Sequence, residues 1–426
     1  MRVALLNPPW RFEHSIYFGC REPHLPLELA CAKVRLEQHG HRTLTLDGHL
    51  NRTEAAELAT QALEFRPDMI VVSTAPSYLF WRCAPPELTV PGELIRLLDG
   101  PAMTVAIGPH GSSTPRTALR KLGVDVVLQG EPDESIAELA DRGAADRVPG
   151  AAWHDGATVR VNGGPQAASF VDLPALSWPD SWIARHRHHH HRFDSAPDAP
   201  GAEVEASRGC PYACSFCAKV DFRDSYRRRE LDALLREIDG LIAQGVGYIY
   251  FIDEIFLPQR PLLEALRDRP VQFGVQTRVD LWKPEMLDLL GAAGCVSVEA
   301  GVESLTPEGR EALDKKCRLS TEELTARLVH ARRSIPFVQA NLIKSAGDDA
   351  AMIAEWRSGL QQQGVWANDP VPLFPYPSSP DYRRLWGEPD DDAWERAHAH
   401  YLAQFDRFSE IQEARPLPLP ELEASL

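Results

Sequence analysis

The feature that most constrains the fold of this chain is a regular alternation of short apolar runs with helical patterns. In residues 1–142, apolar runs such as "VALLN" (3–7) and "DMIVVST" (68–74) alternate with amphipathic stretches such as 26–40 and 133–142. Runs of this length are typical of strands buried on both faces, and the helices between them allow parallel strands. The sequence predicts an α/β fold that begins with a Rossmann-like, doubly wound parallel sheet, whose ligand lies at the carboxyl ends of the strands.

A second alternating region follows a less regular segment. Residues 143–202 are rich in Pro, Gly, Ala and Asp and are interpreted as a linker. The alternation resumes at "AEVEAS" and gives six strand–helix repeats within residues 203–370. Such repeats predict a partial (β/α)6 barrel of the TIM type, with its chemistry at the carboxyl-end mouth. Residues 371–426 are predicted to form a C-terminal extension with a helical tail at about 390–413.

Composition and charge exclude several classes of protein. The chain has 61 acidic and 45 basic residues, a net charge of −16, which disfavours a nucleic-acid partner. No apolar run is long enough to span a membrane, and the N-terminus is too soon broken by proline to be a secretory signal. We therefore expect a cytoplasmic protein, in which clustered thiols suggest metal binding or catalysis before disulfides.

Three cysteines lie close together in the segment "SRGCPYACSFCAK", just after the first predicted barrel strand: Cys210, Cys214 and Cys217. Zinc sites usually take four protein ligands, often as two pairs, and no second pair follows here. Three thiolates in one loop can bind three irons of a 4Fe–4S cluster and leave the fourth iron open to a chelating small molecule. A zinc loop, or thiols that only pack, is the alternative. Cys31 and Cys295 lie on apolar faces and are predicted to be core residues.

This loop closely resembles the cluster-binding loop of radical S-adenosylmethionine (SAM) enzymes. The N-terminal half resembles the cobalamin-binding domain that precedes the barrel in one large branch of them, the class B methylases. The matching segments include "LLNPPW", "GPHGSSTP" and "GVDVVLQGEPDES" before the barrel, and "FIDEIF", "QTRVDLW", "AGCVSVEAGVES" and "FPYPSSPDY" within it. The resemblance implies that SAM chelates the open iron and that one electron from the cluster cleaves it to a radical, which abstracts hydrogen from an unactivated carbon.

Several barrel residues are candidates for SAM binding. Asp253 and Glu254 end the second barrel strand, where a carboxylate could accept hydrogen bonds from the SAM ammonium group. Arg278 ends the third strand and could pair with the SAM carboxylate. Glu303 and Ser304 match a turn that approaches SAM in the family. The alternatives are a helix cap or solvated acid at the second strand, and an ion pair with a neighbouring acid for the arginine.

Substrate contacts are predicted from position alone. Glu299 is expected to face the same side of its strand as Glu303, and a carboxylate inside a barrel is costly unless it binds something. It could contact substrate or pair with a buried arginine. The proline-rich segment 366–382 is expected to close over the barrel mouth, which makes three of its residues candidate substrate contacts: Trp366, Asn368 and Asp369. No catalytic acid or base is identified.

The loops after strands one, three, four and five of the first sheet carry small residues at its ligand edge. Each loop alone could be an ordinary turn. Together they predict a surface that a large flat macrocycle can approach. The candidate cobalamin-binding residues are Asn7, Pro8, Pro9, Ser73, Thr74, Ala75, Gly108, Pro109, His110, Gly130 and Glu131.

Two groups of histidines are considered as metal ligands. "DGHLNR" places Asp47 and His49 in a D-x-H pattern, but it follows the second strand and has Arg52 where a glycine is needed. His14 is the only histidine near the loop after strand one, so no histidine is predicted to bind the cobalt. The segment "ARHRHHHHRFD" (184–194) could bind metal adventitiously, or form an ordered cap or a solvated linker.

These features favour a cobalamin-dependent radical SAM enzyme that transfers methyl groups to a carbon of a small molecule, such as a natural-product or sugar-like intermediate. It would need a 4Fe–4S cluster, SAM, cobalamin and an electron donor such as flavodoxin or ferredoxin. It would have no nucleic-acid or membrane partner. The alternatives are a cyclase or rearrangement enzyme with the same cofactors, and a cobalamin sensor without catalysis.

Overall fold

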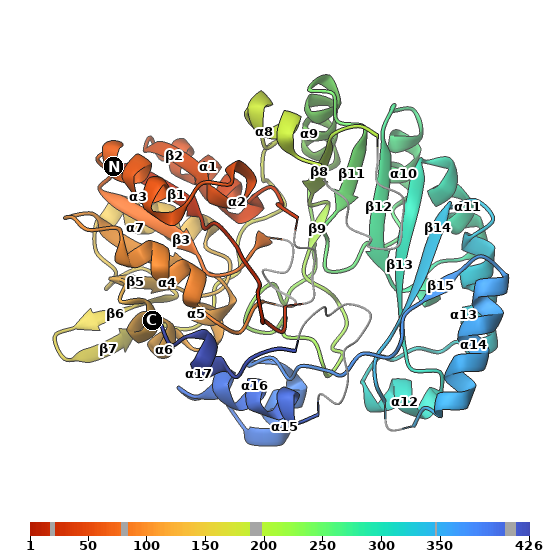
Figure 1. Ribbon diagram of the computed structural model, residues 1–426. Helices are drawn as coiled ribbons and strands as arrows, with labels where there is room; N and C mark the ends of the chain where they lie inside the picture. Colours follow the sequence, from red (N-terminus) through yellow and green to blue (C-terminus); the bar gives the residue numbers. More distant parts are fainter. Residues whose placement is uncertain (18–21, 78–83, 188–197, 346, 405–414) are drawn as a thin grey trace.

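The computed structural model describes residues 1–17, 22–77, 84–187, 198–345, 347–404 and 415–426, and it contains two large sheets that lie side by side (Figure 1). The first sheet has seven strands in the order β2 (Arg42–Asp47), β1 (Arg2–Asn7), β3 (Met69–Ser73), β4 (Met103–Ile107), β5 (Val126–Leu128), β6 (Ala151–Asp155) and β7 (Thr158–Val161).

Strands β2, β1, β3, β4 and β5 are parallel, as the alternating pattern predicts. Their residues alternate between two apolar cores, one beneath α1 and α7 and one beneath α3, α4 and α6. The helices associated with this sheet are α1 (Leu27–Gln38), α2 (Gly48–Asn51), α3 (Ala55–Glu64), α4 (Thr89–Arg96), α5 (Pro109–Ser113), α6 (Pro115–Leu122) and α7 (Asp133–Arg142). The α/β class is therefore confirmed.

The segment interpreted as a linker contains a hairpin that the sequence analysis did not anticipate. Strands β6 and β7 extend the first sheet antiparallel to β5. Gly156, with a φ of 62°, forms the turn between them. Ala151 and Ala152 are buried beside β5, whereas the distal end of the hairpin is exposed. The hairpin is therefore an edge of the sheet with few buried apolar residues.

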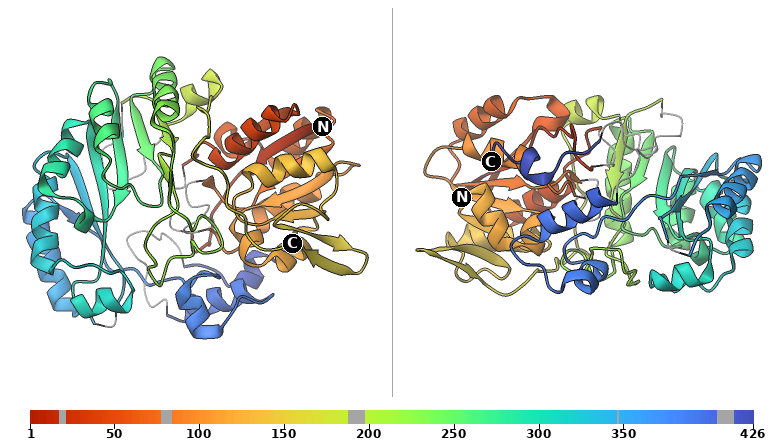
Figure 2. Two further views of the ribbon diagram at one scale, coloured as in Figure 1. Left: turned by 180° about the vertical axis from the view of Figure 1, so that it is seen from behind. Right: turned by 60° about the horizontal axis from the view of Figure 1, so that its bottom comes forward.

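The second sheet consists of six parallel strands in the order β8 (Gly201–Val204), β11 (Tyr248–Phe251), β12 (Gln272–Thr277), β13 (Cys295–Glu303), β14 (Phe337–Leu342) and β15 (Trp366–Ala367). The helices around its outer face are α9 (Leu231–Ala243), α10 (Arg260–Arg267), α11 (Pro284–Ala292), α12 (Pro307–Ala312), α13 (Thr321–Ala331) and α14 (Ala350–Gln362) (Figure 2). The order and the curvature are those of an open, partial barrel.

The two faces of this barrel sheet differ in polarity. One register row joins Val204, Phe251, Val275, Val298 and Val338, and these apolar side chains are buried. The neighbouring row on the opposite face is polar and joins Gln276, Glu299 and Gln339. Because side chains alternate along a strand, the apolar row packs toward the helices and the polar row lines the inside of the barrel.

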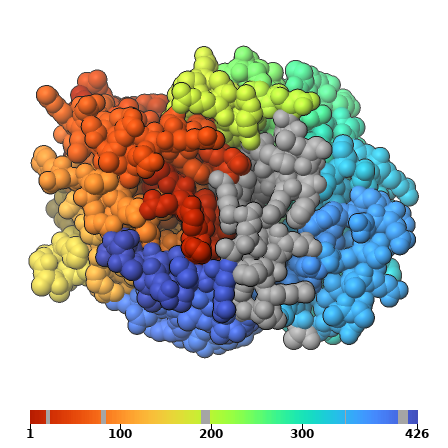
Figure 3. Space-filling view, in the orientation of Figure 1, coloured from red at the N-terminus to blue at the C-terminus, as the bar shows by residue number. Residues whose placement is uncertain are grey.

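The C-terminal segment returns to the first sheet. It contains α15 (Pro380–Trp386), α16 (Ala393–Ala403) and α17 (Leu419–Leu422), which lie below that sheet in Figures 1 and 3. Lys121 of α6 forms ion pairs with Glu395 of α16 and with Glu423. Residues 405–414 of the predicted helical tail lie outside the described residues. Within the described part of the chain, no helix is both long and apolar enough to cross a membrane.

Candidate functional site

The cysteine loop leaves the carboxyl end of β8 through a short strand, β9 (Ser207–Arg208), which pairs with β10 (Arg227–Arg228). Gly209 follows with a φ of 76°, and a Cβ there would overlap the carbonyl of Ser225. Only glycine tolerates both conditions. The loop is thus folded back on itself immediately before Cys210.

The three thiols of the loop form one group. Cys210, Cys214 and Cys217 are free and partly buried, and Cys217 interacts electrostatically with both of the others. Burial is the main cause that raises the pKa of each thiol, for Cys217 to about 12. Lys219 and Lys315 act in the opposite direction, because a cation favours the thiolate. Three clustered sulfur donors with nearby cations fit an iron–sulfur cluster, whose binding displaces the thiol protons.

Asp253 and Glu254, which follow β11, accept hydrogen bonds from the residues that lead into the cysteine loop. Asp253 is fully buried and accepts hydrogen bonds from the Ala206 amide at 2.8 Å and from the Ser207 hydroxyl. Burial raises the pKa of Asp253 to about 8. Glu254 accepts a hydrogen bond from the Gly209 amide at 2.7 Å. Both acids thus contact the backbone or side chains that lead into the cysteines, and a role in SAM binding stays a prediction.

Arg278 lies directly beside the loop. Its guanidinium forms two hydrogen bonds with Asp280, at 3.1 and 2.8 Å, and lies 4.2 Å from the ring centroid of Tyr212, between the first two cysteines. Glu303 has a φ of 72° and accepts a hydrogen bond from the buried Lys315 at 3.2 Å. The structure therefore places Arg278 and Glu303 beside the cysteine loop, and their contact with SAM stays a prediction.

The remaining barrel candidates differ in their surroundings. The Ser304 hydroxyl donates to Asp348 at 2.9 Å. Glu299 accepts a hydrogen bond from Gln276 on the polar inner face. The pairing of β13 with β14 has a bulge between Gly301 and Glu303, but burial still alternates along β13, so Glu299 and Glu303 are both half-buried, as the expected alternation requires.

The three candidates of the proline-rich segment lie at the last barrel strand. Trp366 belongs to β15 and is partly exposed. Asn368 accepts from the Leu342 amide at 2.7 Å and donates to the Leu342 carbonyl at 3.1 Å, so it bridges β14 to the chain after β15. Asp369 pairs with Arg357. Substrate contact by these residues stays a prediction.

A cavity of about 450 Å³ lies at the barrel mouth beside the cysteine loop. It is bordered by Phe216 of the loop, by Lys344 and Ser345 after β14, by Phe374 after β15 and by Arg384 and His400 of the C-terminal segment. The space is large enough for a small organic molecule.

The predicted cobalamin residues gather along one edge of the first sheet, where the parallel strands end. Asn7 is buried and donates to Asp47 at 3.0 Å, and it accepts from the Trp10 indole at 2.8 Å. Pro8 and Pro9 continue from β1. Ser73, Thr74 and Ala75 follow β3 and are buried, and Ser73 lies 3.5 Å from the Asn7 side chain.

The loops after β4 and β5 complete this edge. Gly108 and Pro109 lead into α5, and His110 lies 3.3 Å from the Thr74 hydroxyl. The His110 ring stacks on Trp394 of α16 with 4.4 Å between centroids, and burial lowers its pKa to about 3. Gly130 has a φ of 77° where its backbone meets Gln166, and Glu131 next to it is buried. The edge is thus partly covered by the C-terminal segment.

The two histidines considered as cobalt ligands have different surroundings. His14 is exposed, with a φ of 58°, and His49 on α2 contacts the Phe12 ring edge-on at 6.2 Å. Residues 188–191 of the histidine run lie outside the described residues, but His186 is described and is buried.

Asp47 caps α2 and gives a pH-dependent prediction. It accepts from the Leu50 amide at 2.9 Å, and burial raises its pKa to about 7. The folded protein therefore binds this proton more tightly than the unfolded chain, whose aspartic acids titrate near ~3.9. The contribution of protonated Asp47 to the stability of the fold is complete below the pKa of the unfolded chain. It is lost as the pH rises through about 7.

We expect Asp47→Asn to reduce this loss, because asparagine keeps the acceptor and cannot ionise. The measurement is the melting temperature of both proteins between about pH 4 and about pH 8. Glu28 and Glu87, whose pKa values burial also raises to about 7, titrate in both proteins and cancel from the comparison. Parallel curves for the two proteins would show that Asp47 does not titrate in this range.

The sequence analysis missed a buried ion network that joins the two sheets. Arg208, immediately before Gly209, is fully buried and binds Glu131 at 3.1 Å and Asp133 at 2.9 Å, both after β5. It also binds Glu205 at 3.0 Å, which in turn pairs with Arg223. The cysteine loop and the ligand edge of the first sheet are therefore in direct contact.

Known proteins resemble this chain in the barrel and over most of its length. Residues 204–349 match the family model of the radical SAM superfamily. The hopanoid C-3 methylase of Methylococcus capsulatus is 26% identical over 447 residues, covering 100% of this chain and 79% of the methylase. The anaerobic magnesium-protoporphyrin IX monomethyl ester cyclase of Cereibacter sphaeroides is 23% identical over 407 residues, covering 88% of this chain and 63% of the cyclase.

A solved structure has a similar fold. It is the radical SAM methyltransferase TsrM from Kitasatospora setae, determined with cobalamin and a 4Fe–4S cluster bound. It matches 89% of this chain and 73% of its own, with a TM-score of 0.68 and 19% identity. Residues 204–349, which include the three free cysteines, are thus the part of this chain that is similar to the radical SAM superfamily.

Proposed function

We propose that this protein is a cobalamin-dependent radical SAM enzyme that transfers a methyl group to a carbon atom of a small molecule. The observation that carries the proposal is the direct contact between the cysteine loop and the ligand edge of the first sheet, made by Arg208 with Glu131 and Asp133. Two cofactors bound at these places would face one another, as a transfer between them requires.

Each part of the site has a distinct task. Cys210, Cys214 and Cys217 would hold the cluster, and the loops after β1, β3, β4 and β5 would hold cobalamin. When bound, the cluster supplies the electron that cleaves SAM, and cobalamin carries the methyl group. Asp253 and Glu254 fix the backbone before Cys210, so they hold the thiols in place. The buried network around Arg208 and the covering α16 exclude water from the junction.

The small-molecule substrate is supported by the cavity of about 450 Å³ beside the cysteine loop, whose lining includes Lys344 and Arg384. The polar row Gln276, Glu299 and Gln339 offers further hydrogen-bonding groups inside the barrel. Comparing the small molecules of cells with and without the protein tests the proposal. A methylated compound that disappears with the protein is expected, and identical profiles under expressing conditions would count against it.

Glu254 and Arg278 give a prediction for SAM binding. Glu254→Gln and Arg278→Gln should each weaken SAM binding about tenfold to hundredfold, because a charge-assisted hydrogen bond contributes about 1.5–3 kcal/mol. Glutamine at position 254 still accepts from the Gly209 amide, so the loop and the bound iron should be unchanged. Equilibrium binding of SAM to the reconstituted protein is the measurement.

The matched control for these variants is Asp239→Asn, which removes an exposed partner of Arg269 on the outside of the barrel. It should leave SAM affinity unchanged. If Glu254→Gln and Arg278→Gln bind SAM as tightly as the control does, these side chains do not contact SAM.

The cobalt environment gives a further prediction. His14 is exposed and His49 packs against Phe12, and neither lies in a D-x-H segment after β1. Electron paramagnetic resonance of the cobalt(II) form should therefore show no splitting from an axial nitrogen. The spectrum should be identical in His14→Ala and His49→Ala. Nitrogen splitting that either substitution removes would contradict the prediction.

A second candidate function is radical cyclisation or rearrangement with the same cofactors, which the similarity to the cyclase of Cereibacter sphaeroides favours. Flavodoxin or ferredoxin as electron donor and a cytoplasmic location stay predictions from the sequence.

A further inference from the structure

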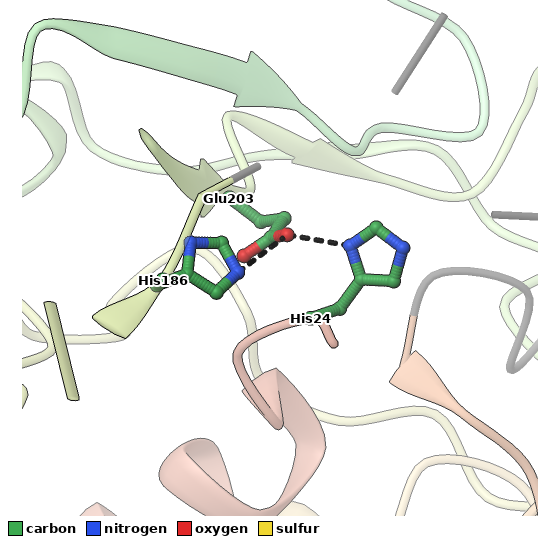
Figure 4. A group of neighbouring side chains, drawn as sticks. All are labelled: His24, His186 and Glu203. Atoms are coloured by element: carbon green, nitrogen blue, oxygen red, sulfur yellow. Dashed lines mark hydrogen bonds and ion pairs between the residues drawn. The ribbon is translucent and has the colours of Figure 1, made fainter. Parts of the chain in front are cut away.

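Away from the cysteine loop, three buried side chains from distant parts of the chain converge on one point (Figure 4). His24 precedes α1 of the first sheet, His186 follows α8 (Asp180–Arg185), and Glu203 lies on β8, the first barrel strand. Their exposed fractions are 4%, 1% and 0%. One donor atom from each lies within 4.8 Å of the other two.

The distances place the carboxylate between the two rings. Glu203 Oε1 is 2.6 Å from His24 Nδ1 and 3.3 Å from His186 Nε2. The second oxygen, Glu203 Oε2, accepts from the Leu25 amide at 3.1 Å. The backbone thus orients the carboxylate so that Oε1 faces both imidazoles.

The far side of the His186 ring is also fixed. His186 Nδ1 lies 2.6 Å from the carbonyl oxygen of Gly201, which can only accept a hydrogen bond. Nδ1 therefore carries a hydrogen, and in the neutral ring the lone pair of Nε2 points at Glu203. A backbone carbonyl in this position is the usual partner of a metal-binding histidine. His186 Nε2 and Glu203 Oε1 are both electron-rich, close together and buried. A positive charge, either a proton or a metal ion, must therefore lie between them.

The donor types suit a metal ion as well as a proton. Two imidazole nitrogens and a carboxylate oxygen suit zinc and also ferrous iron, whereas they are a poor set for calcium or magnesium. Such an ion lies about 2.0–2.2 Å from each donor, so the triangle formed by these three atoms needs only small shifts to enclose it. A fourth position would be left for water or another ligand.

A cavity lies among the chain neighbours of the two histidines. A cavity of about 510 Å³ is lined by Glu22, Pro23, Arg185 and Arg187, the chain neighbours of both histidines, together with Leu50 to Arg52. An ion held here would join the segment before α1, the end of α8 and the strand that leads to the cysteine loop.

We propose that His24, His186 and Glu203 bind one divalent first-row transition-metal ion, zinc or ferrous iron, which clamps the first sheet to the first barrel strand. The site is separate from the cysteine loop and does not depend on the proposed function, since its test measures metal content rather than activity.

The experiment uses the full chain with its cluster reconstituted anaerobically, then exposed to zinc and passed over a desalting column. We expect about one zinc per chain in addition to the cluster iron. Glu203→Gln and His24→Ala should lower zinc at least tenfold. His330→Ala, which removes a half-buried histidine paired with Asp288, is the matched control and should retain the zinc. Replacing His188, His189, His190 and His191 together by glutamine should also leave zinc unchanged.

X-ray absorption at the zinc edge of the unmodified chain keeps the test valid if a variant fails to fold. Nitrogen and oxygen neighbours at about 2.0–2.2 Å, without sulfur at about 2.3 Å, are expected. If zinc does not bind but chelatable iron above the four of the cluster does, and Glu203→Gln removes it, the ion is ferrous iron. Sulfur neighbours, loss of zinc with the histidine run, or no extra metal of either kind would overturn the proposal.

Discussion

The chain in which Cys210, Cys214 and Cys217 are all replaced by alanine is expected to contain no bound iron after anaerobic reconstitution, whereas the unmodified chain contains about four irons. The three thiols interact with one another at the mouth of the barrel, and burial keeps them protonated until a metal displaces the protons. Among the described residues, no other three cysteines lie together. Iron and sulfide analysis is the measurement.

Two controls separate loss of the cluster from loss of the fold. Cys295→Ala changes a buried core thiol and should leave the iron content unchanged. The triple variant should still bind cobalamin, because the apolar core on one face of the first sheet contains no barrel residue. Retention of about four irons by the triple variant would contradict the assignment of the cysteine loop.

Arg208→Met is expected to destabilise the protein by about 3–5 kcal/mol, because it leaves the buried Asp133 without its cation and removes one of the two cations that bind each of Glu131 and Glu205. Arg208 is fully buried among Glu131, Asp133 and Glu205, and its guanidinium lies 4.5 Å from the ring centroid of Phe170. Methionine fills similar volume but cannot neutralise three carboxylates. Since folded proteins are stable by only about 5–15 kcal/mol, the melting temperature should fall markedly.

The matched control is Arg269→Met, which breaks an ion pair with Asp239 at the surface. Exposed pairs of this kind contribute about 0–1 kcal/mol, so its melting temperature should stay close to that of the unmodified chain. Equal melting temperatures for the two variants would mean that the network around Arg208 does not hold the two sheets together.

Much of the fold could be predicted from the sequence because buried parallel strands leave a simple pattern. "VALLN" at 3–7 corresponds to β1 at Arg2–Asn7, and the helix expected at 133–142 is α7 at Asp133–Arg142. The hairpin of β6 and β7 was not found, because it is an edge with few apolar residues. Helix α4 was also missed, since Pro91 and Gly92 interrupt its pattern.

The candidate site could be predicted only in part. The cysteine spacing is local, so it identifies the loop, and Cys31 and Cys295 are confirmed as buried core thiols. The partners of Arg208 and Glu203 are far apart in sequence: Glu131 is 77 positions from Arg208, and His24 is 179 from Glu203. No spacing rule connects such residues, because only the folded sheets bring them together.

Adjacent acids show the same limit at shorter range. The sequence places Asp253 and Glu254 together at the end of β11 but does not distinguish them. In the structure, Asp253 binds Ala206 and Ser207, whereas Glu254 binds Gly209. Which acid lies nearer the cysteines depends on the direction of each side chain after the strand ends, and that is set by tertiary packing.

Counting the products of SAM distinguishes methyl transfer from a radical rearrangement. The reduced, fully reconstituted protein is incubated with SAM and with the small molecule that the cell comparison identifies. We expect one S-adenosylhomocysteine for each product molecule, and a product that carries the methyl group of SAM labelled with carbon-13. A product without the label, accompanied by 5′-deoxyadenosine but no S-adenosylhomocysteine, would contradict methyl transfer and establish a rearrangement. Cobalamin binding without consumption of SAM would instead indicate a sensor.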